Sequence, residues 1–225
     1  MISGSTRLVA LLGHPVAHSL SPRMQNAAFA ARGLDLAYVA LDISPDRLEE
    51  AVRSLAALGF IGANVTAPHK LAAARLCDTE VPSVNTLVLR DGRVEGHSTD
   101  AAVLDGLSAA RPVVIGDGGS AAAFREALPT AKVFSRRGEW PPDVAEADLV
   151  IHATPVRDEV LVRVGPGQTL VDLPYPDSDI AAAAREAGAT VLDGLDVLVA
   201  QGAASFELWT GVPAPVEVMR AAARA

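Results

Sequence analysis

The sequence predicts an α/β protein, because short apolar runs alternate with helix-like segments in two successive series. The first series fills about the first hundred residues, and the second begins near Pro112. Alternation of this kind is typical of parallel sheets covered by helices. Half of the 225 residues are hydrophobic and a fifth are charged, which is ordinary for a globular chain.

In the first series, Ser-Pro pairs at 21–22 and 44–45 predict helix starts, each with a serine cap and a proline in the first turn. Gly33 and Gly59 predict the ends of these helices. Asp91-Gly92 predicts a tight hairpin turn. We expect strands at 7–12, 37–41, 61–65, 86–89 and 94–96, and helices at 21–33 and 44–58.

In the second series, the apolar run at 113–115 leads directly into glycines, as a buried strand before a tight turn does. Further short runs follow at regular intervals. A helix opening near Asp100 marks the boundary between the two series. We expect strands at 113–115, 132–135, 149–152, 169–172 and 190–192, and helices at 121–128 and 180–187.

Composition excludes several classes of protein. The net charge of −8, without a basic tract, argues against a nucleic-acid partner. No apolar run approaches the ~20 residues of a membrane-spanning helix, and residues 1–10 do not read as a signal peptide. The single cysteine, Cys77, fits a reducing cytoplasm. The histidines have no spacing typical of a metal site, so we expect no metal.

The best local motif is the strand at 113–115 followed by Gly116-Asp117-Gly118-Gly119-Ser120 and a helix. Glycines allow a pyrophosphate to approach the backbone, and the helix N-terminus supplies N–H groups. A tight turn without a ligand is the alternative. A carboxylate beside a pyrophosphate is repulsive, so Asp117 would have to point away.

About twenty residues further on, the next strand ends in Ser135-Arg136-Arg137. An NAD site favours an acidic residue here, whereas arginines suit the 2′-phosphate of NADP(H). We therefore expect NADP(H), bound by Gly116, Gly118, Gly119, Ser120, Ser135, Arg136 and Arg137. Solvated surface arginines are the alternative.

Five motifs in order resemble the shikimate dehydrogenase family. They are GHPVAHSLSP at 13–22, NVTAPHK at 64–70, VNT at 84–86, GHSTD at 96–100 and GLDVLVAQ at 194–201, with Trp209-Thr210-Gly211 also fitting. The resemblance spans nearly the whole chain. It implies a substrate domain with a mainly parallel sheet at 1–99 plus 197–225, a Rossmann-like NADP-binding domain at 100–196, and a cleft between them.

Chemistry and the resemblance agree on a catalytic pair, Lys70 and Asp100. Ketone reduction needs a proton donor at the developing alkoxide. Only Lys70 and Lys132 are lysines, and a lysine, unlike an arginine, can lose its proton. The alternatives are a surface lysine and an acidic residue favoured at a helix N-terminus.

The resemblance also implies that the substrate is a small carbocyclic hydroxy acid. Ser19 and Ser21 would bind its carboxylate, with Tyr175 nearby, and Thr66, Asn85 and Gln201 its hydroxyls. Ser21 could instead cap a helix, Asn85 shape a turn, and Tyr175 serve only packing.

The resemblance implies reversible, NADPH-dependent reduction of 3-dehydroshikimate to shikimate by a cytoplasmic monomer or homodimer. Several positions depart from the family pattern: Ser98 replaces an asparagine, Gln25 a histidine, and Ser135-Arg136-Arg137 the usual Asn-Arg-Thr. Three segments also look trimmed. A quinate or aminoshikimate dehydrogenase, or a ligand-binding protein without turnover, therefore remains an alternative.

Overall fold

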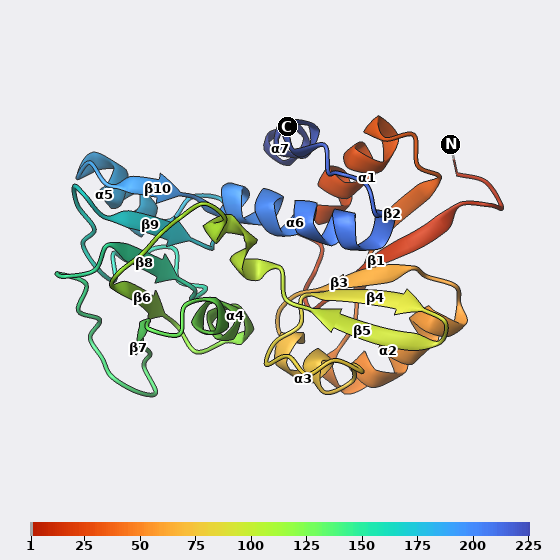
Figure 1. The fold of residues 1–225 in the computed structure, drawn as a ribbon, viewed down its shortest axis with the longest axis horizontal. Helices are drawn as coiled ribbons and strands as arrows, with labels where there is room; N and C mark the ends of the chain where they lie inside the picture. Colours follow the sequence, from red (N-terminus) through yellow and green to blue (C-terminus); the bar gives the residue numbers. More distant parts are fainter. Residues whose placement is uncertain (1) are drawn as a thin grey trace. The chain divides into compact units, whose positions relative to one another are not determined.

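The computed structural model describes residues 2–225 and divides the chain into two compact units. The first unit comprises the chain up to Thr99 together with Val199–Ala225, and the second is Asp100–Leu198. Figure 1 shows an α/β arrangement in each unit, with one sheet and its covering helices. No helix within residues 2–225 is long and apolar enough to cross a membrane.

The sheet of the first unit has the strand order β2-β1-β3-β4-β5. β1 pairs in parallel with β2 and β3, whereas β4 and β5 are antiparallel. Asp91 (φ 52°) and Gly92 (φ 75°) form the predicted turn of the β4–β5 hairpin. The strands are β1 (Arg7–Gly13), β2 (Leu36–Asp42), β3 (Gly62–Val65), β4 (Thr86–Arg90) and β5 (Arg93–His97).

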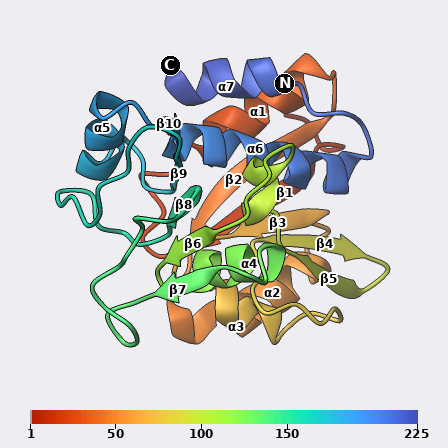
Figure 2. The same cartoon turned by 60° about the vertical axis from the view of Figure 1, so that its left-hand side comes forward.

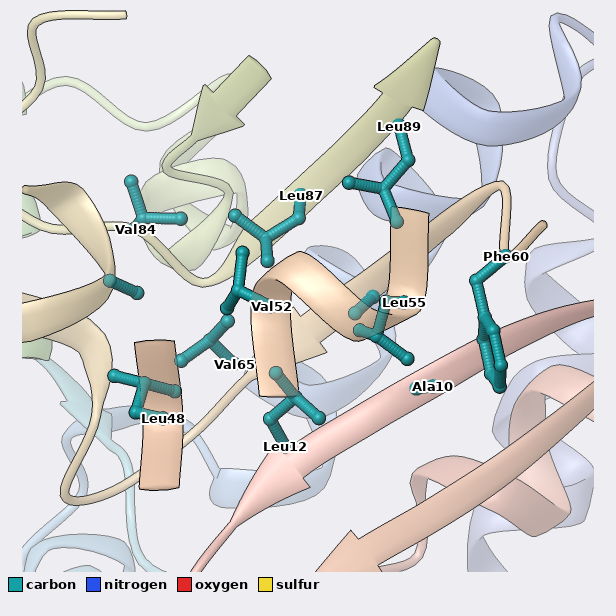
Figure 3. Packing of buried hydrophobic residues seen from close by; sticks show 12 residues of the cluster. Ala10, Leu12, Leu48, Val52, Leu55, Phe60, Val65, Val84, Leu87 and Leu89 are labelled. Atoms are coloured by element: carbon teal, nitrogen blue, oxygen red, sulfur yellow. The ribbon is translucent and has the colours of Figure 1, made fainter. Parts of the chain in front are cut away.

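Helices cover both faces of this sheet. Residues alternate along β1, so Ala10 and Leu12 pack with Leu48, Val52 and Leu55 on one face (Figure 3). On the other face, the stacked rings of Phe29 and Phe206 have centroids 5.5 Å apart. The helices are α1 (Ser21–Ala31), η1 (Pro45–Arg47), α2 (Leu48–Ala57), α3 (Lys70–Ala74), α6 (Gly194–Thr210) and α7 (Val216–Arg224).

The last helix of the chain lies beside the first. In Figures 1 and 2, α7 runs next to α1, and the Arg23 guanidinium donates to the Ala223 carbonyl oxygen at 2.9 Å. Buried Met219 and Ala223 form the inner face of α7. The C-terminal segment therefore belongs to the first unit although the whole second unit precedes it.

The sheet of the second unit has the order β10-β9-β8-β6-β7, and all its strands are parallel. Val113 and Ile115 of β6 pack with α5 on one face, and Val114 packs with α4 on the other. The elements are η2 (Asp100–Leu104), β6 (Pro112–Ile115), α4 (Gly119–Ala127), β7 (Lys132–Phe134), β8 (Leu149–His152), β9 (Thr169–Asp172), α5 (Asp179–Glu186) and β10 (Thr190–Leu192).

The structure confirms the predicted α/β class and the predicted strands, to within one or two residues at their ends. One cap residue was wrong, and two helices that begin where we expected differ in kind from the prediction. Leu20, not Ser21, is the cap residue of α1, and Ser21 is its first residue. The expected helix at 44–58 is split into η1 and α2, without a side-chain cap from Ser44. The helix at Asp100 is the short 3-10 turn η2.

Candidate active site

In each sheet there is one point where the connections after two neighbouring strands run in opposite directions. Ligands of open α/β sheets bind at the carboxyl ends of the strands at such a point. In the first unit this position is the carboxyl edge of β1 and β3. A Cβ on Gly13 would lie 2.5 Å from the Thr66 methyl, so only glycine lets the two loops meet. The Thr66 amide donates to the Leu12 carbonyl oxygen at 2.9 Å. Thr66 is thus fixed at the edge where we expected the substrate.

Ser19 lies in the connection from β1 to α1 and Ser21 is the first residue of α1, at the same edge of the sheet. The Ser19 hydroxyl accepts from the amide of Ser21, the first residue of α1, at 3.2 Å. Ser21 is 6% exposed. One turn later, Gln25 donates to the Gly202 carbonyl oxygen at 2.9 Å, which places α1 against the residue after Gln201.

Asn85 is a buried hub rather than a simple turn residue. Its side-chain amide donates to Thr99 Oγ1 at 2.9 Å and to Gln201 Oε1 at 3.3 Å. Its side-chain oxygen accepts from the Thr99 amide at 2.7 Å, and its carbonyl accepts from Val65 at 2.8 Å. Asn85 and Gln201 therefore meet directly, next to the strand that leads to Thr66.

Sequence reasoning missed the polar network behind Asn85. Asn64, Thr86 and Ser205 are at most 4% exposed and bond to one another at 2.7–3.1 Å. Thr99 and Ser205 both donate to the Gln201 carbonyl oxygen, and the Tyr38 hydroxyl donates to Asn64. Buried polar groups need such partners, so this network fixes the backbone on which Asn85 and Gln201 lie.

Lys70 is the first residue of α3, and its backbone oxygen accepts from the Val84 amide at 3.1 Å. The preceding residue, His69, is 1% exposed and bonds through Nε2 to the Ile43 carbonyl oxygen at 2.7 Å. These two bonds hold the start of α3 beside Asn85. The backbone of Lys70 therefore lies near the same edge of the sheet as Thr66.

Asp100 follows Thr99 directly and is 5% exposed. It begins η2, in the second unit. The catalytic pairing of Lys70 with Asp100, across the two units, stays a prediction. Two positions before Asp100, where the resemblance led us to expect an asparagine, the buried Ser98 hydroxyl has no hydrogen-bond partner within residues 2–225.

In the second unit, the glycine turn lies at the carboxyl ends of β6 and β8, where the strand order reverses. Gly116 has φ +134°, and a Cβ there would lie 2.6 Å from the Ala153 carbonyl oxygen. Gly118 has open space above it and is the cap residue of the nine-residue α4, with Gly119 and Ser120 starting the helix. This turn fits a pyrophosphate, because a ligand can approach its N–H groups directly.

Of the two arginines after β7, Arg137 lies next to this turn. Arg137 Nη1 is 3.8 Å from Asp117 Oδ2, so the carboxylate is directed to the guanidinium. Arg136 donates to Glu159 at 3.4 Å and lies over the Trp140 ring at 5.6 Å. The Ser135 backbone closes a short loop with Gly138 at 3.0 Å. The structure thus brings the arginine loop and the glycine turn together, as an NADP(H) site requires.

Tyr175 lies between β9 and α5 and is half-buried, so its role at the substrate carboxylate stays a prediction. Sequence reasoning overlooked His152 and Asp172, the last residues of β8 and β9, which are both fully buried and bond to each other at 2.6 Å. Their signal was a titratable residue at the end of each of two successive strands.

The exposed histidine His14 bonds to Asp42 at 2.6 Å. This hydrogen bond, opposed by partial desolvation, lowers the pKa of the Asp42 carboxyl. Over residues 2–225, no three His, Cys, Asp or Glu side chains converge in a way that could hold a metal ion.

Comparison with known proteins agrees with these features. Residues 11–87 match the model of the shikimate dehydrogenase substrate binding domain, and residues 194–224 match that of the shikimate 5′-dehydrogenase C-terminal domain. A shikimate dehydrogenase (NADP(+)) of Anaeromyxobacter sp. (strain K) is 41% identical, over 96% of this chain and 95% of the relative. The chain belongs to the shikimate dehydrogenase family.

Other members of the shikimate dehydrogenase family support the same assignment. The Moorella thermoacetica enzyme is 40% identical over 97% of this chain and 92% of its own length. The Aquifex aeolicus structure superposes with a TM-score of 0.89 at 30% identity and full coverage of both chains. The Thermus thermophilus enzyme, solved with NADP(H) and shikimate, gives 0.84 at 31% identity, over 97% of this chain and 98% of its own.

Proposed function

We propose that this protein catalyses the reversible NADP-dependent oxidation of shikimate to 3-dehydroshikimate. The observation that carries the proposal is the gathering of Thr66, Asn85 and Gln201 with the start of α3 at one edge of the first sheet. The first unit would then correspond to the substrate domain expected at 1–99 plus 197–225, and the second to the dinucleotide domain expected at 100–196, with the second boundary at Val199 rather than at 197.

In this reaction the substrate carbon loses a hydride and its hydroxyl loses a proton. When bound, NADP+ supplies the acceptor for the hydride. Lys70 takes the hydroxyl proton in the oxidation and returns it in the reduction, because an ammonium can lose a proton and a guanidinium effectively cannot. Asp100 orients the Lys70 side chain.

The other site residues bind and orient. Ser19, in the β1–α1 connection, and Ser21, at the start of α1, hold the substrate carboxylate, with Tyr175 nearby. Thr66, Asn85 and Gln201 hold the ring hydroxyls. Asn85 and Gln201 are already fixed by the network of Thr99 and Ser205, so they would need little reorganisation on binding.

The dinucleotide would bind at the turn of Gly116, Gly118, Gly119 and Ser120, with Ser135, Arg136 and Arg137 at the 2′-phosphate. Arg137 beside the turn, with Arg136 next to it in the chain, favours NADPH over NADH. We also place the enzyme in the cytoplasm, as a monomer or homodimer. The free, half-buried thiol of Cys77 fits that reducing compartment.

The test measures formation of reduced cofactor from NADP+ with shikimate, quinate or an aminoshikimate. We expect turnover with shikimate. Lys70→Ala and Lys70→Arg should each lower kcat about a hundred- to ten-thousandfold while NADP+ still binds. Lys132→Ala, which changes the only other lysine, is the matched control and should leave kcat unchanged.

Shikimate binding without turnover in the wild type would favour a ligand-binding protein. Turnover with quinate or an aminoshikimate but not with shikimate would show that the protein is a quinate or aminoshikimate dehydrogenase instead. Normal activity in Lys70→Arg would remove Lys70 from the proton transfer.

A further inference from the structure

The second unit contains a buried chain of side-chain hydrogen bonds that the proposed reaction does not use. His152 ends β8 and Asp172 ends β9, and the two residues are paired in the parallel ladder. Both side chains have 0% exposure, and His152 Nδ1 lies 2.6 Å from Asp172 Oδ1. An ionised carboxylate only accepts hydrogen bonds, so Nδ1 carries the proton and Nε2 faces the other way.

Each end of this pair has a further partner. The Ser178 hydroxyl donates to Asp172 Oδ2 at 2.6 Å and accepts from the Ala181 amide at 3.3 Å, so it also caps α5. At the other end, His152 Nε2 lies 2.6 Å from the Thr154 hydroxyl. Thr154 Oγ1 in turn accepts from the Val156 amide at 3.3 Å. The chain therefore runs from the α5 cap to the loop after β8.

That loop lies against the proposed dinucleotide site. The Ala153 amide donates to the Ile115 carbonyl oxygen at 2.8 Å, and the Ala153 carbonyl oxygen fills the space where a side chain on Gly116 would be. These residues follow β8, beside β6, where the strand order reverses. The loop at 153–156 therefore packs directly against the glycine turn, and a shift of this loop would remove the support of Gly116.

We propose that His152 is a positioning residue of the dinucleotide site: fixed by Asp172, it holds Thr154 and so keeps the loop at 153–156 against Gly116. The inference rests on the proposed function, since it assumes that NADP+ binds at this turn. A fully buried imidazole has no access to a ligand and acts through Thr154. Asp172 sets the tautomer of His152, as carboxylates do for metal-binding and catalytic histidines.

The alternative is that the pair only stabilises the second unit. Calorimetric titration of the full-length protein with NADP+, well below each variant's thermal midpoint, distinguishes the two. His152→Asn keeps a donor for Asp172 but is too short to reach Thr154 as well. We expect it to raise the dissociation constant of NADP+ about five- to tenfold, the effect of one or two lost hydrogen bonds.

Three further variants sharpen the test. Thr154→Val should weaken NADP+ binding as His152→Asn does, and Thr154→Ser, which restores the hydroxyl, should bind as the wild type. Ser178→Ala is the matched control, because it breaks the same chain at the α5 end. It should lower the thermal midpoint and leave the dissociation constant within about twofold of the wild type.

Wild-type affinity in His152→Asn, with only a lower thermal midpoint, would overturn the proposal and leave a stabilising core pair. An equal loss of affinity in Ser178→Ala would also overturn it, since the effect would then follow stability alone. Absence of saturable NADP+ binding in the wild type would instead remove the proposed function itself, and this inference with it.

Discussion

At the scale of single residues, the neighbours of Asp117 explain how a carboxylate can lie beside a proposed pyrophosphate site. A carboxylate at Asp117 repels a pyrophosphate unless it points elsewhere, and it lies 3.8 Å from the Arg137 guanidinium. Arg136 forms a similar ion pair with Glu159, at 3.4 Å. Both arginines proposed for the 2′-phosphate are thus already close to a carboxylate, which reduces the positive charge that NADP(H) would meet.

Replacing Asp117 by asparagine should therefore strengthen NADPH binding. The pair is exposed, so the gain is modest, up to about fivefold in the dissociation constant. NADH, which lacks the 2′-phosphate, should change less. Fluorescence titration with both cofactors at low ionic strength measures the difference.

Glu186→Gln is the control, because it removes the same charge at the far end of α5. Weaker NADPH binding in Asp117→Asn would mean that the carboxylate orients Arg137 rather than competing for it.

Cys77 gives a pH-dependent prediction. Burial, with the Asp78 carboxylate adding to it, raises the pKa of the thiol from 9.0 to about 11. The Cys77 thiol also donates to the Ala73 carbonyl oxygen at 3.2 Å. Because the thiolate is the reactive form, alkylation by iodoacetamide at about pH 8 should be about a hundredfold slower in the native protein than in urea.

The sign of the stability effect follows from the same shift. The unfolded thiol ionises first, so the contribution of Cys77 to stability is complete below pH 9.0 and is lost as the pH rises toward about 11. Equal labelling rates in native and unfolded protein would contradict the burial of this thiol.

At the scale of secondary-structure elements, strands were predicted better than helix starts. Short apolar runs bounded by glycine, such as 113–115, identify strands because both faces of these sheets are covered. The Ser-Pro pairs were less informative. A proline fits the first turn of a helix without identifying the cap residue: the cap of α1 is Leu20, and the Ser21 amide donates to the Ser19 hydroxyl.

The site could be predicted only where a motif is local. The glycine turn and the loop at 64–70 are continuous in sequence, so a role for each could be proposed from the sequence alone. The network of Asn64, Thr86 and Ser205 joins residues up to 141 positions apart, and no local pattern signals such a contact. The His152–Asp172 pair depends on which strands are neighbours, which only the sheet order decides.

Substitutions at two glycines of the same turn test stability and NADP+ affinity separately. Gly116→Ala should destabilise the second unit by about 1–3 kcal/mol, because φ is +134° and the Cβ would meet the Ala153 carbonyl oxygen. Gly118 has φ −81° and open space, so Gly118→Ala should unfold as the wild type does.

If the pyrophosphate approaches the turn closely, Gly118→Ala should still weaken NADP+ binding, by about tenfold. Urea unfolding and calorimetric titration of the two variants provide both measurements. Unchanged NADP+ affinity in Gly118→Ala would move the pyrophosphate away from this residue.

At the scale of the whole molecule, the two units share one strand order but carry different side chains at the ends of their strands. In each, the first strand of the sheet lies between the second and the third, so the connections leave it in opposite directions. Gly13 with Thr66 marks this position in the first unit, and Gly116 with Ala153 marks it in the second. Hydroxyls and amides follow in the first unit, suited to a polyol acid, and open N–H groups with arginines follow in the second, suited to a dinucleotide phosphate.

This division predicts that each ligand stabilises its own unit. Trp209 is 6% exposed in the first unit, and Trp140 is 37% exposed in the second, beside Arg136. In Trp140→Phe, fluorescence reports the first unit, and in Trp209→Phe it reports the second.

A ligand at a hundred times its dissociation constant adds about 2.7 kcal/mol to the unfolding free energy of the unit that binds it. NADP+ alone should therefore raise the urea midpoint of the Trp140 signal, and shikimate alone that of the Trp209 signal. The reverse pattern would exchange the roles of the two units, because a ligand stabilises only the folded segment that binds it.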